Sequence, residues 1–422
     1  MKKGPRILLV TDRYFPEVGG SITWFHNVYR RYPPGSVWIT TQDYPGAKEF
    51  DSAHPGLRFT RQSLKRYPFL KPESLLIYLK LASSALWIAA RRKIDIIHAS
   101  KVLPEGLVAR IVSRVLGIPY VVYAHGEEIT IFAGVPRLKK RLPAVYNGAA
   151  AVIVNSSFTK SQLEGSGCHC RNVVRISPGV DPSFFTPGPA DEALREAQCL
   201  DGKLVLLSVG RLTRRKGHDN VIRALPAVLR ACPDLVYVIV STGEEEASLK
   251  ELARTLGVEG SVRFAGELPY EDLPRYYRTA DVFILANRTL PNGDVEGFGI
   301  VFLEANACGK PVIVGSSGGT GDPVREGFNG LRVDAAKVEE IEKAILELAR
   351  SPSRREQMGR NGRSIVEAEY AWERVVEKTK QLDLSLSRPD FGATGGGDAD
   401  TAAPGDEKGV PDVIAGDIPC RD

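Results

Sequence analysis

The sequence predicts two doubly wound α/β domains that face each other across a cleft, followed by a single helix and a polar tail. Three observations lead to this fold class. Short, almost continuously apolar runs alternate with helical patterns, the alternation stops once at a proline-rich segment and restarts, and 422 residues exceed one ordinary core. Strands that are apolar on both faces are typical of a parallel sheet covered by helices on both sides.

The first domain is predicted to span residues 1–180. Its most apolar segment, residues 75–90, contains Lys80 and is shorter than the ~20 residues that span a bilayer, so we expect a half-buried helix there. The N-terminal apolar run, Ile7 to Val10, is too short for the core of a signal peptide and reads as a buried strand. The predicted strands of this domain are 6–10, 36–40, 94–99, 119–124 and 150–155.

A linker rich in proline and glycine, residues 177–192, separates this domain from a second one at 181–368. A helix at 369–384 follows, and residues 385–422 are so rich in Gly, Asp, Ala and Pro that we expect disorder. Two facing domains of this kind bring the carboxyl ends of both sheets to one cleft, where ligands bind. The predicted strands of the second domain are 203–210, 235–241, 261–266, 280–286 and 310–315.

The charge distribution indicates which binding partners suit the protein, and the cysteine content indicates the redox state of its compartment. Residues 1–180 carry 26 Lys and Arg against 11 Asp and Glu, which favours an anionic partner or else a merely solvated basic surface. The lone C-x-C of Cys168 and Cys170 reads as surface thiols in a reducing compartment. No D-x-D motif or His/Cys cluster offers itself in either domain, so we expect no metal site.

The stretch "FPEVGGS", residues 15–21, follows the first predicted strand. Gly19 and Gly20 have no side chains, so their backbone N–H groups can approach a ligand closely. Ser21 is then expected to cap a helix whose N-terminus favours anions. Paired glycines are also common in any turn, and that alternative stays open.

The stretch "SVGRLTRRKGHD", residues 208–219, holds the corresponding place after the first strand of the second domain. Arg211 and Lys216 are spaced so that one loop can direct both cations at one anion. A guanidinium and an ammonium suit phosphate oxygens, although four solvated cations are the alternative.

Two acids flank a glycine-spaced apolar run in "DVEGFGIVFLEANACGKPVI", residues 294–313. The pattern predicts a helix that begins near Phe298 or Gly299 and ends at Gly309, with Glu296 just before it and Glu304 inside it. The helix dipole could stabilise both acids. However, Glu304 lies on a helix that is apolar nearly all round, so its charge needs partners, and two vicinal hydroxyls such as a ribose diol would supply them.

His125 follows a predicted buried strand in "VVYAHGEE", residues 121–128. A lone histidine is usually structural. At the mouth of a cleft it becomes a candidate for hydrogen bonding or proton handling.

Together, the E-x7-E pair of Glu296 and Glu304, the "GRLTRRKG" and "PEVGG" loops and the "SPGVD" hinge resemble retaining glycosyltransferases of family 4, which have the GT-B fold of two Rossmann-like domains. The resemblance runs from about residue 5 to residue 382 and implies a nucleotide-diphosphate sugar as donor. The catalytic residues that it implies are His125, Arg211, Lys216 and Glu296. The donor-binding residues that it implies are Gly19, Gly20, Arg211, Lys216, Arg263, Glu267, Glu296, Phe298, Gly299, Ile300, Val301 and Glu304.

Within that set, the resemblance assigns the diphosphate to Arg211 and Lys216, the ribose to Glu304 and the sugar to Glu296 and His125. The nucleotide base is assigned to residues 263–268. It also implies a reaction with retention, which we expect to need no metal and no cofactor beyond the donor, because cations and helix N–H groups can stabilise the leaving diphosphate.

The segments "GDVEGFGIVFLEA" and "AHGEE" are similar to those of bacterial phosphatidylinositol mannosyltransferases. This favours GDP-mannose as donor, with a UDP-hexose close behind, and a lipid-linked or polysaccharide-precursor acceptor. Cations and aromatics mix in residues 61–72 and 137–143, which suits docking on an anionic membrane. We therefore expect a cytoplasmic enzyme, peripheral on the inner face of the cell membrane, that binds no nucleic acid.

Three alternatives remain at this point. The first is a UDP-sugar-dependent transferase with a soluble acceptor, and the second is a nucleotide-sugar epimerase of similar fold, which needs no acceptor. The third is a non-catalytic nucleotide-sugar sensor. A nucleic-acid binder would explain the basic first half but not Glu296 and Glu304.

Overall fold

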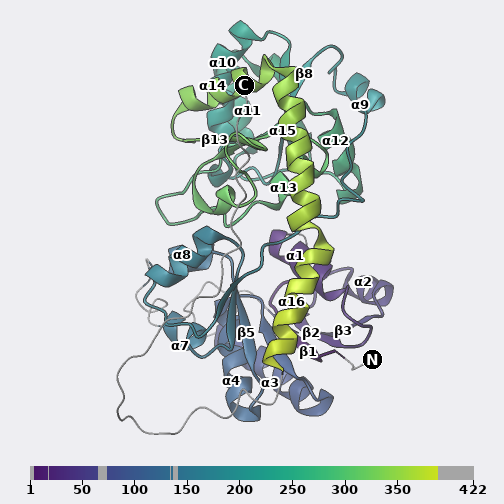
Figure 1. Cartoon of the computed structure of the whole chain (residues 1–422), viewed down its shortest axis with the longest axis vertical. Helices are drawn as coiled ribbons and strands as arrows, with labels where there is room; N and C mark the ends of the chain where they lie inside the picture. Colours follow the sequence, from purple (N-terminus) through teal and green to yellow (C-terminus); the bar gives the residue numbers. More distant parts are fainter. Residues whose placement is uncertain (1–3, 18, 65–73, 134, 136–140, 388–422) are drawn as a thin grey trace, which may run out of the picture. The chain divides into compact units, whose positions relative to one another are not determined.

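Two parallel sheets form the frame of the chain (Figure 1). The computed structural model describes residues 4–17, 19–64, 74–133, 135 and 141–387, which belong to one compact unit ending at Ser387. The tail expected to be disordered, residues 385–422, lies outside the described residues except for its first three.

The first sheet has seven strands in the order β3-β2-β1-β4-β5-β6-β7, all paired in parallel. Its strands are β1 (Ile7–Val10), β2 (Val37–Gln42), β3 (Leu57–Gln62), β4 (Ile96–Ala99), β5 (Tyr120–Ala124), β6 (Ala151–Val154) and β7 (Val173–Arg175). The second sheet has six strands in the order β10-β9-β8-β11-β12-β13, again in parallel. These are β8 (Leu204–Val209), β9 (Leu235–Val240), β10 (Val262–Gly266), β11 (Val282–Leu285), β12 (Val312–Gly315) and β13 (Gly330–Val333). The prediction of two doubly wound α/β domains is thus confirmed.

Helices cover both faces of the first sheet. Because strand side chains alternate between faces, Leu8 and Val10 pack with α3, α4 and α7, whereas Ile7 and Leu9 pack with α1 and α16. The helices around this sheet are α1 (Gly20–Tyr29), α2 (Ala47–Ala53), α3 (Ser74–Arg92), η1 (Val102–Gly106), α4 (Leu107–Leu116), α5 (Glu127–Ala133), α7 (Leu142–Tyr146), α8 (Ser157–Gly165) and α16 (Trp372–Leu386).

The second sheet is covered in the same way, with α10, α11 and α14 on one face and α12, α13 and α15 on the other. Its α-helices are α9 (Glu192–Ala197), α10 (His218–Ala231), α11 (Glu246–Thr255), α12 (Leu273–Thr279), α13 (Ile300–Ala307), α14 (Val338–Ala349) and α15 (Pro352–Ile365). Its short helical turns are η2 (Arg214–Lys216), η3 (Glu259–Ser261), η4 (Tyr270–Asp272), η5 (Gly318–Gly321) and η6 (Val366–Tyr370).

The last described helix, α16, packs beside α1 on the first sheet (yellow in Figure 1). Its Asp383 is fully buried there. One carboxylate oxygen accepts from the Tyr32 hydroxyl at 2.6 Å and the other lies 2.9 Å from His98 Nε2. A buried carboxylate with these partners fixes the register of α16 on the first domain.

The half-buried helix expected at 75–90 is confirmed as α3. Leu81 and Ile88 are buried in the first core, whereas Leu79 and Trp87 are exposed. Among the described helices, none is long and apolar enough to cross a bilayer.

Candidate active site

Loops at the carboxyl ends of the two sheets touch each other. The Thr130 hydroxyl in α5 donates to the Gly293 carbonyl at 2.6 Å, and the Ser157 backbone N–H in α8 donates to Asp322 at 2.8 Å. A Cβ at position 297 would collide with the His125 carbonyl oxygen. Gly297 therefore permits the loop before α13 to pass directly against the loop after β5.

Glu296 lies in that loop and is surrounded by donors. Its Oε2 atom accepts from Lys216 Nζ at 2.6 Å, from Arg215 Nη1 at 2.7 Å and from Asn287 Nδ2 at 3.2 Å. Burial acts to raise the pKa of Glu296, but Lys216 and Arg215 outweigh it and hold the pKa at about 2. The carboxylate is therefore charged at neutral pH and holds both cations in place.

The two cations come from η2, a short turn after β8. Gly217 ends the turn with a φ of 72°, and a Cβ there would collide with the Ala286 carbonyl at the end of β11. Arg215 also reaches Asp294 at 3.1 Å. Sequence reasoning missed Arg215, although the "RRK" triplet offered two cations that one turn could direct at the same acid.

Arg211, expected to act with Lys216, stands apart from this cluster. Its side chain is exposed, and its guanidinium has no hydrogen-bonding or ionic partner among the described residues. The structure thus brings Lys216 to Glu296 and leaves Arg211 facing solvent after β8.

Glu304 lies in α13 and is only 5% exposed. Its Oε2 atom accepts one hydrogen bond, from the Tyr277 hydroxyl at 2.7 Å. Burial raises the pKa of Glu304 to about 7, and the Tyr277 hydroxyl offsets only part of that rise. The expected helix is confirmed, since α13 starts after Gly299 and Gly309 ends it with a φ of 72°.

The start of α13 lies beside the loop after β1. A Cβ at Gly20 would stand 3.9 Å from the Ile300 side chain, so the glycine pair and the helix start are neighbours. The first-turn N–H groups of α13 have no partner within the helix, which makes its N-terminus an anion-binding position. Phe298 is buried beside it, and Ile300 and Val301 are half-buried. The expectation that Ser21 caps α1 was wrong, because α1 begins at Gly20 and its N-cap is Gly19.

His125 is held by the first domain. Its Nε2 atom lies 2.8 Å from the Ser100 carbonyl oxygen, and its backbone N–H donates to Glu128 at 2.8 Å. The ring packs edge to face against Trp24 and Phe25. Because a carbonyl oxygen can only accept, Nε2 carries the hydrogen and Nδ1 is the ring nitrogen left for a ligand.

The segment assigned to the nucleotide base, residues 263–268, contains two candidate donor-binding residues, which lie at different ends of β10. Arg263, near the amino end, donates to the carbonyls of Gly260 at 2.8 Å and Gln198 at 3.4 Å. Glu267 follows the carboxyl end and is exposed. Arg263 therefore does not join the cluster around Glu296.

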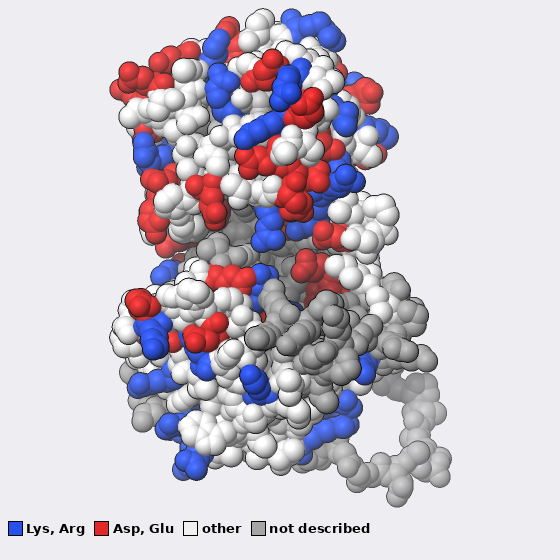
Figure 2. All heavy atoms as spheres, turned by 180° about the vertical axis from the view of Figure 1, so that it is seen from behind, with Lys and Arg blue, Asp and Glu red and all other residues white. Residues whose placement is uncertain are grey.

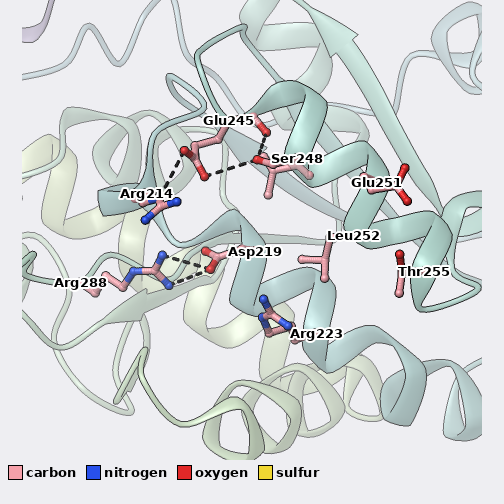
Figure 3. Close-up of a pocket in the computed structure, with 10 residues that line it drawn as sticks. Arg214, Asp219, Arg223, Glu245, Ser248, Glu251, Leu252, Thr255 and Arg288 are labelled. Atoms are coloured by element: carbon pink, nitrogen blue, oxygen red, sulfur yellow. Dashed lines mark hydrogen bonds and ion pairs between the residues drawn. The ribbon is translucent and has the colours of Figure 1, made fainter.

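A separate pocket of about 520 Å³ lies between η2, α10 and α11 (Figure 3). Two ion pairs cross it, Arg288 with Asp219 at 3.0 Å and Arg214 with Glu245 at 3.4 Å. Neither Lys216 nor Glu296 lines it, and its acids already have cations, so it is distinct from the cluster described above.

Metal-ligating side chains do not gather within the described part of the chain, where no group of three or more His, Cys, Asp or Glu could hold an ion. Metal independence itself stays a prediction. The expectation that Cys168 is a surface thiol was wrong, because it is buried in the first core.

Comparison with known proteins identifies the family. Residues 19–184 match the model described as "Glycosyltransferase Family 4", and residues 191–365 match "Glycosyl transferases group 1". A Corynebacterium glutamicum "GDP-mannose-dependent monoacylated alpha-(1-6)-phosphatidylinositol monomannoside mannosyltransferase" is 30% identical over 396 residues, which cover 92% of this chain and 100% of that protein. The chain belongs to glycosyltransferase family 4.

One further relative supports this membership, and a solved structure shows the fold. A "GDP-mannose-dependent alpha-(1-6)-phosphatidylinositol monomannoside mannosyltransferase" of Mycolicibacterium smegmatis is 32% identical and covers 87% of this chain and 95% of its own length. The structure of Anabaena HepE in complex with UDP and glucose superposes with a TM-score of 0.76 at 20% identity, and covers 90% of this chain and 99% of HepE. The family-4 chain therefore has the GT-B fold and is a glycosyltransferase.

Proposed function

We propose that this glycosyltransferase moves mannose from GDP-mannose to a phosphatidylinositol-based lipid acceptor, with retention at the anomeric carbon and without a metal. The observation that carries the proposal is the convergence of Lys216 and Arg215 on Glu296, directly before a helix that holds the nearly isolated Glu304. Cations, a free helix start and a buried carboxylate are what a nucleoside diphosphate needs.

These groups define one orientation of the donor, with its diphosphate between the ribose and the sugar. The diphosphate takes the start of α13 with Lys216 and the exposed Arg211, and Glu304 accepts from the two ribose hydroxyls inside the helix. Glu296 accepts from a sugar hydroxyl through the oxygen that the cations leave free. Nδ1 of His125 faces the sugar from the first domain, because Nε2 is held by the Ser100 carbonyl.

The bond between the anomeric carbon and the phosphate oxygen breaks, a bond from the acceptor oxygen to that carbon forms on the same face, and the acceptor proton passes to the leaving phosphate. Negative charge builds on the diphosphate, where Lys216, Arg211 and the N–H groups of α13 stabilise it. Glu296 keeps Lys216 and Arg215 in place before the reaction starts, so no reorganisation is needed in the transition state.

The donor and acceptor are inferred from the relatives. Those aligned over most of this chain are named for GDP-mannose and phosphatidylinositol mannosides. The Catenulispora acidiphila "D-inositol 3-phosphate glycosyltransferase 1" is 30% identical over 67% of this chain and 70% of its own length. It makes a soluble inositol phosphate the second candidate acceptor, and the UDP in the HepE structure makes a UDP-sugar the second candidate donor. With a lipid acceptor, we expect the enzyme to work at the cytoplasmic face of the membrane.

The deciding experiment is a matrix of donors and acceptors. The full chain is incubated with GDP-mannose or UDP-sugars, with a phosphatidylinositol mannoside, inositol phosphate or no acceptor, and nucleotide release and product are measured. The proposal expects release that depends on GDP-mannose and the lipid, unchanged by EDTA, with an α-linked product by NMR. UDP-sugar transfer to inositol phosphate would establish the second candidate, and loss of transfer in EDTA would refute metal independence.

A further inference from the structure

Three ionisable side chains, those of Asp12, Lys101 and Glu105, meet at the carboxyl edge of the first sheet, outside the donor site. Strands β1 and β4 pair in parallel, with Val10 opposite Ala99. Asp12 and Lys101 each lie two residues beyond these paired positions, so the register of the two strands brings both to the same edge. There, Lys101 Nζ donates to both carboxylate oxygens of Asp12, at 3.0 Å each.

Glu105 lies in the turn η1 and is fully buried. The Gly106 N–H closes this turn on the Lys101 carbonyl at 2.9 Å, which brings Glu105 back toward β1. Its Oε1 atom accepts from the Asp12 backbone N–H at 2.9 Å and lies 3.8 Å from Lys101 Nζ. Its other oxygen, Oε2, accepts from no donor among the described residues. A buried carboxyl oxygen without a donor needs a physical explanation, because such groups are costly.

A proton on Glu105 provides that explanation. Burial raises the pKa of Glu105 to about 8; the Lys101 charge opposes this rise, whereas the charge and the hydrogen bond of Asp12 support it. A hydrogen bond between two carboxyl groups needs a proton between them. At neutral pH, Glu105 is therefore the neutral acid that donates and Asp12 is the carboxylate that accepts. The three side chains together then carry no net charge.

The accessible part of the cluster lies next to His125. The side chain of Asp12 is 17% exposed and that of Lys101 is 29% exposed, so a ligand can reach both, whereas Glu105 is closed off. Lys101 directly follows Ser100, whose carbonyl lies 2.8 Å from His125 Nε2. The contact that orients His125 is thus one residue away from Lys101.

The overall charge of the first domain does not explain this cluster. Residues 1–180 carry 26 Lys and Arg against 11 Asp and Glu, and Figure 2 shows mainly basic side chains on the lower part of this domain. Two acids around one lysine reverse that balance. The basic segments expected to dock on an anionic membrane lie largely outside the described residues, since only 61–64 of residues 61–72 and only 141–143 of residues 137–143 are described.

A carboxylate beside an ammonium group suits a polyol. Each hydroxyl group both donates and accepts, so Asp12 can accept from one hydroxyl while Lys101 donates to its neighbour. An ionised Glu105 would repel the Asp12 carboxylate. As a neutral acid it instead holds that carboxylate in place by donating to it.

We propose that Asp12 and Lys101 bind neighbouring hydroxyl groups on the polyol ring of the acceptor, and that Glu105 positions Asp12 through a hydrogen bond. The inference rests on the proposed function, because it assigns residues of this chain to that function's acceptor. Asp12 and Lys101 contact the acceptor and orient its attacking hydroxyl beside His125. Glu105 does not reach the acceptor and acts through Asp12.

The first test compares acceptor and donor kinetics of full-length variants. Asp12→Asn and Lys101→Met are each expected to raise the KM for a phosphatidylinositol mannoside at least about tenfold, the effect of losing one hydrogen bond to a charged group. The KM for GDP-mannose is expected to stay unchanged. The control is Asp234→Asn, which removes the partner of Lys203 in an exposed ion pair of the second domain and is expected to change neither KM. An acceptor KM at the wild-type value in both variants would overturn the proposal.

The second test asks whether Glu105 acts as a neutral acid. Glutamine keeps a carbonyl for the Asp12 N–H and an N–H for the Asp12 carboxylate. Glu105→Gln is therefore expected to keep the acceptor KM within about threefold of wild type, whereas Glu105→Leu is expected to raise it at least about tenfold. Calorimetric titration with GDP shows whether each variant is folded. A Glu105→Gln protein that binds GDP normally but loses the acceptor would refute the positioning role, whether or not Glu105→Leu folds.

Binding without turnover separates this inference from the proposed function. Saturation-transfer NMR with inositol phosphate as the probe, in the presence of GDP, detects the polyol site directly. A signal in wild type that Asp12→Asn lacks supports the site even where no donor and acceptor give transfer, a result that would refute only the proposed function. Wild type without a signal, or equal signals in the two proteins, would overturn the site.

Discussion

Glu296 and Glu304 lie eight positions apart in one stretch of sequence, yet their surroundings are opposite. Glu296, before α13, has Lys216, Arg215 and Asn287 on one oxygen, and its pKa is about 2. Glu304, inside α13, has the Tyr277 hydroxyl as its one side-chain partner in the described part of the chain, and its pKa is about 7. Burial alone therefore does not decide the charge of a carboxylate, because the partners that the fold supplies decide it.

The difference shows what each acid contributes to the folded protein. The charged form of Glu296 is stabilised by the fold itself, so this acid holds a structure together. The charged form of Glu304 is opposed by the fold and becomes favourable only when a ligand brings hydrogen-bond donors. An acid that the fold opposes is typical of a binding site.

The largest expected effect is that of Glu296→Gln. Without the charge, Lys216 and Arg215 lose their common partner next to the leaving diphosphate, and the rate of transfer is expected to fall by at least about 10²-fold. Steady-state kinetics with GDP-mannose checks this. Glu347→Gln, on an exposed carboxylate that pairs with Arg354, serves as the control and is expected to change nothing.

A smaller effect is expected for Arg215→Met, because Lys216 still holds Glu296. Asp294 and Glu296 lose one cation, and transfer is expected to slow by about tenfold, the size of one charge-assisted hydrogen bond. The matched control is Arg214→Met in the same turn, whose side chain is exposed and, among the described residues, pairs with Glu245 alone. Equal losses in the two variants would contradict the role given to Arg215.

The pH dependence of donor binding is expected to follow Glu304. Only the ionised carboxylate accepts from two ribose hydroxyls, and its pKa in the free protein is about 7. Affinity for GDP is therefore expected to fall as the pH drops below about 7, approaching tenfold per pH unit. Calorimetric titration across this range measures it, and a flat profile would show that Glu304 does not bind the nucleotide.

Tyr277→Phe is expected to produce the smallest change. The hydroxyl lowers the pKa of Glu304, so its removal raises that pKa and moves the loss of GDP affinity upward by about one pH unit. Tyr276→Phe, on the same helix but only half-buried, is the control and is expected to leave the profile in place.

The sequence predicted the central strands well and the edge strands poorly. The three strands that it missed, β3, β7 and β13, each end a sheet, and β3 and β7 are largely half-buried or exposed; β10, which also ends a sheet, was predicted. Continuous apolarity reports burial on both faces, which an edge strand lacks.

In the candidate site, too, some residues could be predicted from the sequence and others could not. Glu296, Glu304 and Lys216 could be singled out because each breaks a local pattern or follows a strand. Arg215 and Tyr277 could not, since an arginine beside two other cations and a tyrosine in an ordinary helix become partners of these acids only through tertiary contacts. The role of Gly297 also depends on the approach of the other domain to its backbone.

The central claim is that the fold stabilises one acid and opposes the other, and unfolding of Glu304→Gln and Glu296→Gln at pH about 8 tests it most directly. The folded pKa of Glu304, about 7, lies above its unfolded value of about 4.5, so the cost of this group to stability grows as the pH rises between these two values and is complete above about 7. For Glu296, whose folded pKa is about 2, the charge adds stability that is lost only as the pH falls from about 4.5 toward 2. Glu304→Gln is therefore expected to raise the free energy of unfolding and Glu296→Gln to lower it, each by on the order of 3 kcal/mol. Glu304→Gln should bind GDP more weakly despite its greater stability. A Glu304→Gln protein that is less stable than wild type and binds GDP equally well would contradict the account.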